Sequence, residues 1–150
     1  MRLSKKGWNN VLIFGVLLII FIFNFSQQLR LSTVVSQRTV ISSDLTIVEI
    51  ETPDYVITRV GRNWESNPSV GLSSDNLQQI VNNWQAVPLD ALTEQDLPTS
   101  NFVLKFFVTE QVQPIIVQLH QQQNDQYILQ VDENSFLSLP TEKLTSFLGR

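Results

Sequence analysis

The feature that most constrains this chain is an apolar run near its N-terminus, from Val11 to Phe25. Thirteen of its fifteen residues are Leu, Ile, Val or Phe, and only Gly15 and Asn24 interrupt it. With the four residues before it, the run would reach about 28 Å as a helix, close to the ~30 Å hydrocarbon thickness of a bilayer. The run therefore predicts a transmembrane helix over residues 8–25.

The sequence around the run indicates an anchor that is kept rather than a signal peptide that is cleaved. No A-x-A-like pair of small residues follows it, since the chain there reads NFSQQLRLST and pairs Ser26 only with Asn24 or Gln28. Arg2, Lys5 and Lys6 precede the run and only Arg30 follows it closely, so the positive-inside rule places residues 1–7 in the cytoplasm. We therefore predict a single-pass protein of the bacterial inner membrane, anchored by its signal sequence, with its C-terminal part in the periplasm.

The rest of the chain divides into a polar tether, residues 26–43, and one small extracytoplasmic domain, residues 44–150. From residue 31 onward six Lys and Arg residues stand against fourteen Asp and Glu, a net charge of −8. Such an acidic domain is a poor nucleic-acid binder, because phosphate contacts need clustered cations. The chain has no cysteine, which excludes disulfides, thiol catalysis and thiolate metal sites.

Hydrophobic periodicity predicts five strands and two helices in this domain. The strands are expected over residues 44–51, 55–64, 101–108, 114–122 and 126–131, with a connecting loop over 89–100. Ser73 or Ser74 should cap a helix that ends before Pro88, and Thr141 should cap a short second helix. The order predicts an α+β fold: after the single N-terminal transmembrane helix comes a small antiparallel sheet with two helices packed on one face.

Few side chains suggest catalysis. His120 is the only histidine, and no nucleophile, orienting acid or second metal ligand is recognisable beside it. Glu49 and Glu51 share a strand face and Asp54 follows them, but a solvent-facing charged edge explains them better than acid–base chemistry or a calcium site. We therefore predict a protein that is not an enzyme and has no cofactor and no metal site.

Three residues of the second predicted strand form a candidate ligand-binding site. Arg59, Arg62 and Trp64 could hold an anionic or glycan ligand through guanidinium hydrogen bonds and ring stacking. Cross-strand packing of the tryptophan beside surface cations is the more common meaning of such a pattern. Both interpretations stay open from the sequence.

The pattern resembles a bacterial family of membrane-anchored envelope proteins of unknown function. The similarity rests on YVITRVGRNW (55–64), on the helix that begins SSDNLQQIVNNW (73–84), and on YILQV and SFLSLP before the last helix, and it spans roughly residues 44–148. Larger members carry this unit repeatedly, some alongside transport components. No catalytic residues are known for the family, so the resemblance implies a fold and an envelope location but no activity.

The sequence supports two hypotheses about function. The first is a non-enzymatic accessory or scaffold protein of the cell envelope, bound to the membrane through residues 8–25 and to another envelope protein. Recovery of the protein alone after crosslinking in cells would contradict it. The second is a ligand-binding or sensory module for an anionic or glycan ligand at Arg59, Arg62 and Trp64.

Overall fold

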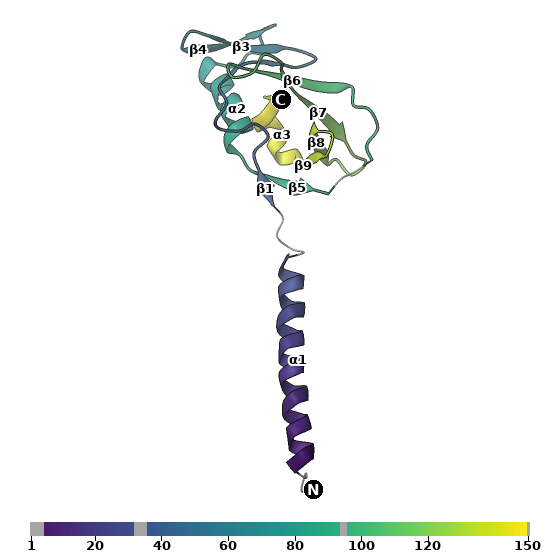
Figure 1. The fold of residues 1–150 in the computed structure, drawn as a ribbon. Coiled ribbons are helices and arrows are strands. Elements are labelled where there is room, and N and C mark those ends of the chain that lie inside the picture. Colours follow the sequence, from purple (N-terminus) through teal and green to yellow (C-terminus); the bar gives the residue numbers. More distant parts are fainter. Residues whose placement is uncertain (1–4, 32–35, 94–95, 150) are drawn as a thin grey trace. The chain divides into compact units, whose positions relative to one another are not determined.

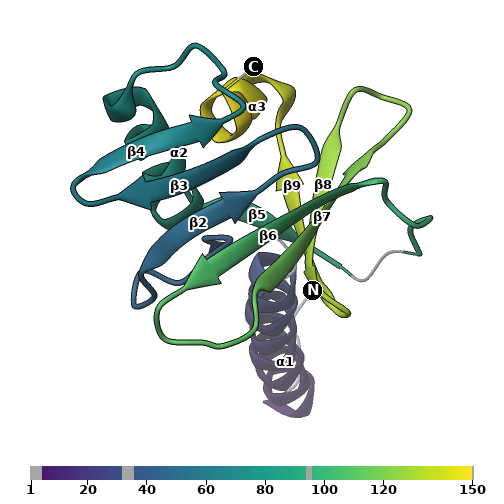
Figure 2. The same ribbon diagram turned by 90° about the horizontal axis from the view of Figure 1, so that it is seen from above.

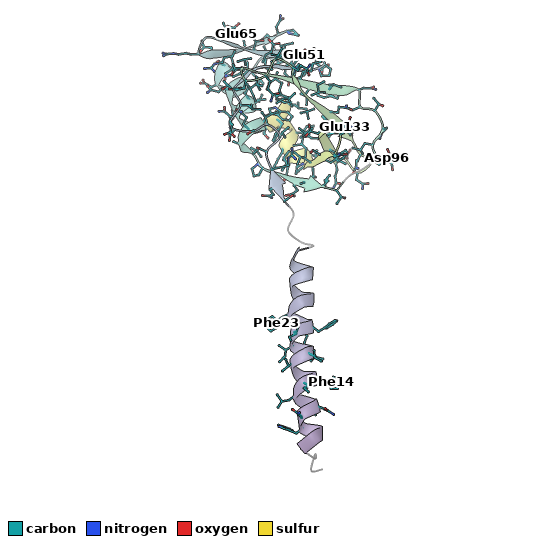
Figure 3. The ribbon with its side chains drawn as sticks, in the orientation of Figure 1. Phe14, Phe23, Glu51, Glu65, Asp96 and Glu133 are labelled. Atoms are coloured by element: carbon teal, nitrogen blue, oxygen red, sulfur yellow. The ribbon has the colours of Figure 1, made fainter. Side chains whose placement is uncertain are left out.

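The computed structural model describes residues 5–31, 36–93 and 96–149 of the chain (Figure 1). The chain separates into two compact units, residues 1–35 and residues 36–150. In the first unit the structure describes one helix, α1 (Lys5–Leu31). Large apolar side chains project from it into solvent, among them Phe14, which is 73% exposed, and Phe23, which is 67% exposed (Figure 3).

The predicted transmembrane helix over residues 8–25 is wrong. Within the described residues, no helix is both long enough and apolar enough to cross a membrane. Asn9, Asn10 and Asn24 fall within the predicted span, and the stretch between them, Val11 to Phe23, would rise only about 20 Å as a helix. The single-pass inner-membrane location and the periplasmic placement of the domain depended on that span and are overturned with it. Arg2, used to orient it, lies outside the described residues.

The second unit is built on one nine-stranded antiparallel sheet and two helices (Figure 2). The sheet order is β1-β5-β9-β8-β7-β6-β2-β3-β4. The strands are β1 (Gln37–Arg38), β2 (Ile47–Glu51), β3 (Val56–Val60), β4 (Asn63–Asn67), β5 (Leu89–Leu92), β6 (Phe102–Val108), β7 (Ile115–Gln121), β8 (Tyr127–Asp132) and β9 (Ser135–Leu139). The helices are α2 (Ser74–Ala86) and α3 (Thr141–Leu148).

The predicted small sheet of five strands is therefore corrected to nine, and two of the missed strands lie beyond tight turns. The single strand expected over residues 55–64 folds back at Gly61, whose φ of 66° suits the first position of a two-residue type II′ turn, so that β3 pairs with β4. The β8–β9 hairpin turns at Glu133–Asn134 without a glycine to mark it. The other two are β5, which occupies the expected loop after Pro88, and the two-residue β1, which pairs with it.

The domain also begins earlier than expected. Residues 36–43, assigned to the tether, belong to the folded unit, because β1 pairs with β5 and the next two apolar residues enter the core. Val40 is 4% exposed and Ile41 is 1% exposed, and the Ile41 N–H donates to the Trp84 carbonyl at 3.0 Å. Val40 and Ile41, two apolar residues within a polar segment, thus attach that segment to the hydrophobic core.

The helix expected before Pro88 is confirmed as α2. The Ser73 hydroxyl accepts a hydrogen bond from the Asn76 N–H at 3.3 Å, which is the N-cap interaction. The cap predicted for the last helix is wrong, because Thr141 is the first residue of α3 and its hydroxyl donates to the Asp125 carbonyl instead. Both helices pack against the sheet around Trp84, which is 1% exposed.

Gly149 ends α3 in a left-handed conformation with no room for a side chain. Its φ is 74°, and an added Cβ would lie 2.7 Å from Leu72 Cδ1 and 3.0 Å from Ile80 Cδ1. Gly71 also has a φ of 74°, but no atom lies within 4 Å of an added Cβ. Both glycines therefore need a positive φ, but only at Gly149 would an added Cβ meet neighbouring side chains.

We expect Gly149→Ala to lower the free energy of unfolding by more than Gly71→Ala does. The left-handed conformation costs an alanine about 1–2 kcal/mol at either position, and only at Gly149 must packed side chains also shift. Urea unfolding of the two variants and the parent measures the difference. Equal losses would show that Leu72 and Ile80 move aside without cost.

Candidate functional site

A hollow of about 280 Å³ lies between α2, the β3–β4 hairpin and the start of β2. All three residues predicted as a ligand site, Arg59, Arg62 and Trp64, line it. The other lining residues are Leu45, Thr46, Ile47, Gln78, Val81, Asn82 and Gln85. The fold thus brings the predicted residues together at one place.

The hairpin explains how the three side chains meet. Arg59 and Trp64 are direct cross-strand partners in β3 and β4, so they project from the same face of the sheet. That face is the one that packs on α2, because Ile57, two residues before Arg59, is 1% exposed in the core. Arg62 occupies the second position of the turn and is exposed at the hairpin tip.

Trp64 forms the floor of the hollow rather than an open stacking platform. Its side chain is 7% exposed and belongs to the core cluster, together with Ile47 and Val81. Its backbone N–H donates to the Ser74 hydroxyl at 2.8 Å, which satisfies a donor on the outer side of the edge strand β4. The packing role of the tryptophan, one of the two alternatives from the sequence, is therefore present in the structure.

The wall on the α2 side is held by Gln85. Its Nε2 donates to the Leu45 carbonyl at 2.6 Å and to the Ser42 carbonyl at 3.1 Å, which ties the segment before β2 to the helix. Glu110 Oε2 accepts the Thr46 N–H at 2.8 Å, and this bond is the main cause of a pKa lowered to about 2 at Glu110. Thr46 N–H is therefore already used, and the donors left to a ligand are side chains.

The two arginines have no acidic partner. Arg59 Nε donates to the Gly61 carbonyl at 3.3 Å, and no hydrogen bond to the Arg62 side chain occurs among the described residues. An ion pair joins Lys105 to Glu51 at 3.1 Å, away from both arginines. No Asp or Glu of the described ranges lines the hollow, so two cations gather at one point of an otherwise acidic domain.

Three amides of α2 were not anticipated as site residues. Gln78, Asn82 and Gln85 follow one another at i, i+4 and i+7, which places them on one helix face beside the apolar stripe. That spacing was visible in the sequence. It became informative only when the fold placed this face opposite Arg59 and Arg62.

The carboxylates considered for chemistry lie elsewhere and have simple partners. Glu49 accepts a hydrogen bond from Thr58 Oγ1 at 3.1 Å, and Glu51 pairs with Lys105. Asp54 lies in the turn between β2 and β3, where its N–H donates to Thr52 Oγ1 at 3.3 Å. Across the described ranges, no three His, Cys, Asp or Glu side chains are grouped closely enough to hold a metal ion.

His120 is 6% exposed, and its Nε2 lies 3.2 Å from Gln130 Oε1. The partner of this imidazole nitrogen is a neutral amide oxygen rather than a carboxylate or a nucleophile. The arrangement therefore lacks the orienting acid that a catalytic histidine requires.

Comparisons with protein-family models, with curated proteins and with solved structures found no match to this chain. The resemblance to bacterial envelope proteins therefore stays a hypothesis that rests on the sequence pattern.

Proposed function

We propose that the domain of residues 36–150 is a binding module for a small anion carrying a carboxylate or phosphate group. One observation supports this most directly: Arg59 and Arg62 line a single hollow without a carboxylate partner and without an acidic neighbour in its lining. A guanidinium group is a fork of donors that fits the paired oxygens of such anions. The amides of Gln78 and Asn82 add neutral donors from the opposite wall.

The size of the hollow restricts the ligand. At about 280 Å³ it lies just under the ~300–1,000 Å³ of sites for drug-sized molecules. Its floor of Trp64, Val81 and Ile47 is buried, so the surface left to contact a ligand belongs mainly to polar groups. The ligand is therefore a small organic acid or a compact phosphate compound.

The acidic surroundings favour small anions over polyanions. The domain carries far more carboxylates than cations, and at physiological salt their repulsion extends over about 8 Å. A small anion inside the hollow contacts the arginines within that distance, whereas a long polyanion must also lie along the acidic surface. The accessory or scaffold role expected from the sequence stays a separate hypothesis and does not conflict with ligand binding.

The test is calorimetric titration of the full chain with phosphate, citrate and acetate at low ionic strength. We expect at least one of them to bind, and Arg59→Gln and Arg62→Gln to weaken that binding by about tenfold or more each, because a hydrogen bond to a charged group contributes about 1.5–3 kcal/mol.

Arg38→Gln is the matched control, because Arg38 is an exposed arginine in β1 at the opposite end of the sheet, where it donates to Ser135 Oγ at 3.3 Å. Its affinity should equal that of the parent. The proposal fails if none of the three anions binds, or if Arg38→Gln weakens binding as much as Arg59→Gln and Arg62→Gln do.

A further inference from the structure

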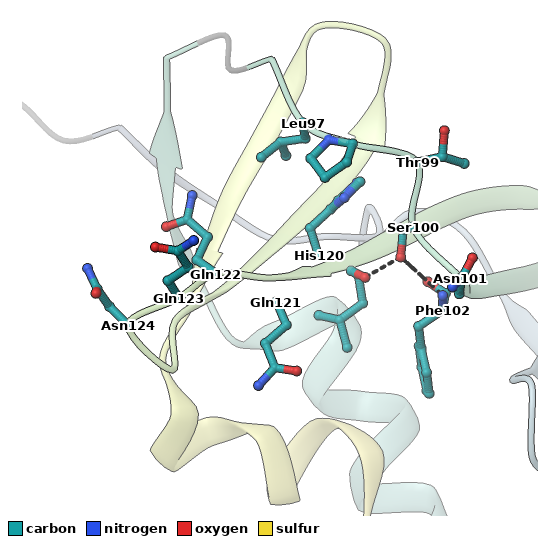
Figure 4. A pocket seen from close by; sticks show the side chains of 12 residues that line it. Leu97, Thr99, Ser100, Asn101, Phe102, His120, Gln121, Gln122, Gln123 and Asn124 are labelled. Atoms are coloured by element: carbon teal, nitrogen blue, oxygen red, sulfur yellow. Dashed lines mark hydrogen bonds between the residues drawn. The ribbon is translucent and has the colours of Figure 1, made fainter.

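A second, larger hollow of about 760 Å³ lies far from the arginines in sheet order, where β6 begins and the β7–β8 hairpin turns (Figure 4). One wall is the segment from Leu97 to Phe102, and the other runs from Leu119 to Asn124. Its volume falls within the ~300–1,000 Å³ typical of small-molecule sites.

Through His120, which lines it, this hollow adjoins a small, largely apolar cluster on the sheet face that points away from α2 and α3. Leu119, Leu129 and Leu137 are in register across β7, β8 and β9 and face the main core. Residues one position along each strand project from the other face. On that face the side chains of His120, Ile128 and Phe136 are only 6%, 2% and 3% exposed. Neither α2 nor α3 covers this face, so another part of the chain must shield it from solvent.

The segment before β6 covers this face near His120. Leu97 lies on the same side of the hollow as the imidazole ring (Figure 4), and Pro98 belongs to the same lining. Ser100 attaches the segment to the sheet, since its hydroxyl donates to the Leu119 carbonyl and accepts the Phe102 N–H at 3.1 Å. The wall is therefore held in place without a ligand.

The polar lining of the hollow is neutral. Among the residues that the structure describes, no Asp, Glu, Lys or Arg contributes to it. Asn101, Gln121, Gln123 and Asn124 are exposed amides, and within the described part of the chain their side chains form no hydrogen bonds. Thr99 adds an exposed hydroxyl.

These groups match the chemistry of sugar hydroxyls. An amide side chain offers both donors and an acceptor, and a hydroxyl group is likewise both donor and acceptor. A charged ligand would find no counter-charge here, so burying it would be unfavourable. Leu97 and Pro98 supply an apolar wall suited to the C–H face of a pyranose ring.

We propose that this hollow is a binding site for a neutral polyhydroxyl compound of the size of a mono- or disaccharide. The site is independent of the arginine hollow, which takes anions. Gln123 and Asn124 at the hairpin tip contact the sugar hydroxyls, and Leu97 and Pro98 contact the ring.

The experiment measures the melting temperature of the full chain with glucose, N-acetylglucosamine and maltose, and with glucose 6-phosphate as the charged counterpart. A ligand that binds only the folded state raises the melting temperature with concentration. We expect at least one neutral sugar to do so, and the phosphorylated sugar to be weaker in an Arg59→Gln/Arg62→Gln background, where the other hollow is disabled.

The double variant Gln123→Ala/Asn124→Ala should weaken sugar binding by about tenfold, because two neutral hydrogen bonds to the sugar hydroxyls are lost. Gln111→Ala/Gln113→Ala is the matched control, since both are exposed amides of the β6–β7 hairpin outside the lining, and it should bind as the parent does. The proposal is overturned if no neutral sugar raises the melting temperature, if an uncharged tripeptide amide binds instead, or if the Gln123/Asn124 variant binds normally.

Discussion

Replacing Trp84 by alanine should lower the free energy of unfolding of the domain by about 3–5 kcal/mol, the usual cost of truncating a buried large aromatic residue. Trp84 is 1% exposed and is the largest of the fully buried side chains. Its ring lies edge-on to Phe106, with centroids 5.0 Å apart, and to Phe147 at 4.8 Å. The loss is a large part of the ~5–15 kcal/mol that stabilises a typical domain.

A hydrogen bond adds to this effect. Trp84 Nε1 donates to the Phe147 carbonyl at 3.0 Å, so the indole joins α2 to the end of α3. Trp84→Phe keeps most of the ring contacts and removes the donor, and it should therefore lie between the parent and Trp84→Ala. Urea unfolding followed by circular dichroism measures all three proteins. A loss below about 1 kcal/mol for Trp84→Ala would contradict the central position of this residue.

Ile41→Ala should destabilise the domain by about 2–5 kcal/mol, as for other buried isoleucines. Ile41 is 1% exposed, and its N–H is bonded to the Trp84 carbonyl, so the residue attaches the N-terminal segment to the main core. If residues 36–43 were a tether, as their sequence suggests, the same substitution would have almost no effect.

Val112→Ala is the matched control, because Val112 is a β-branched residue that is fully exposed at 102% in the β6–β7 hairpin. Its change in unfolding free energy should stay within about 0.5 kcal/mol. Unfolding curves recorded side by side for the two variants make the comparison. If both variants lose a similarly small amount of unfolding free energy, residues 36–43 are a linker and not part of the core.

Elements with a strong local signal were predictable from the sequence. The apolar positions Leu77, Ile80, Val81 and Trp84 recur at helical spacing after a serine cap, and all four are buried in α2. The β7–β8 hairpin was likewise predicted, since two apolar runs flank the polar turn that contains Asp125. In both cases the signal comes from residues that are close together in the sequence.

Weaker signals misled the prediction where the outcome depends on distant partners. β5 reads as a loop because four residues after a proline show no clear period, and it becomes a strand by pairing with β9 on one side and β1 on the other. In β2 a bulge lies between Ile47 and Glu49, so Ile47 and Ile50 are both buried. Simple alternation along a strand cannot anticipate such a shift.

The candidate sites show the same division. The sequence by itself determined which residue types are present: two arginines near a tryptophan, one histidine, and no cysteine. Only the tertiary structure placed Arg59 and Arg62 opposite the amides of α2, because a two-residue turn at Gly61 reverses the chain there. Only it left the amides of the β7–β8 hairpin around a hollow, because Ser100 attaches a distant segment to β7. Local sequence specifies the periodicity of an element, whereas pairing across many residues decides which faces meet.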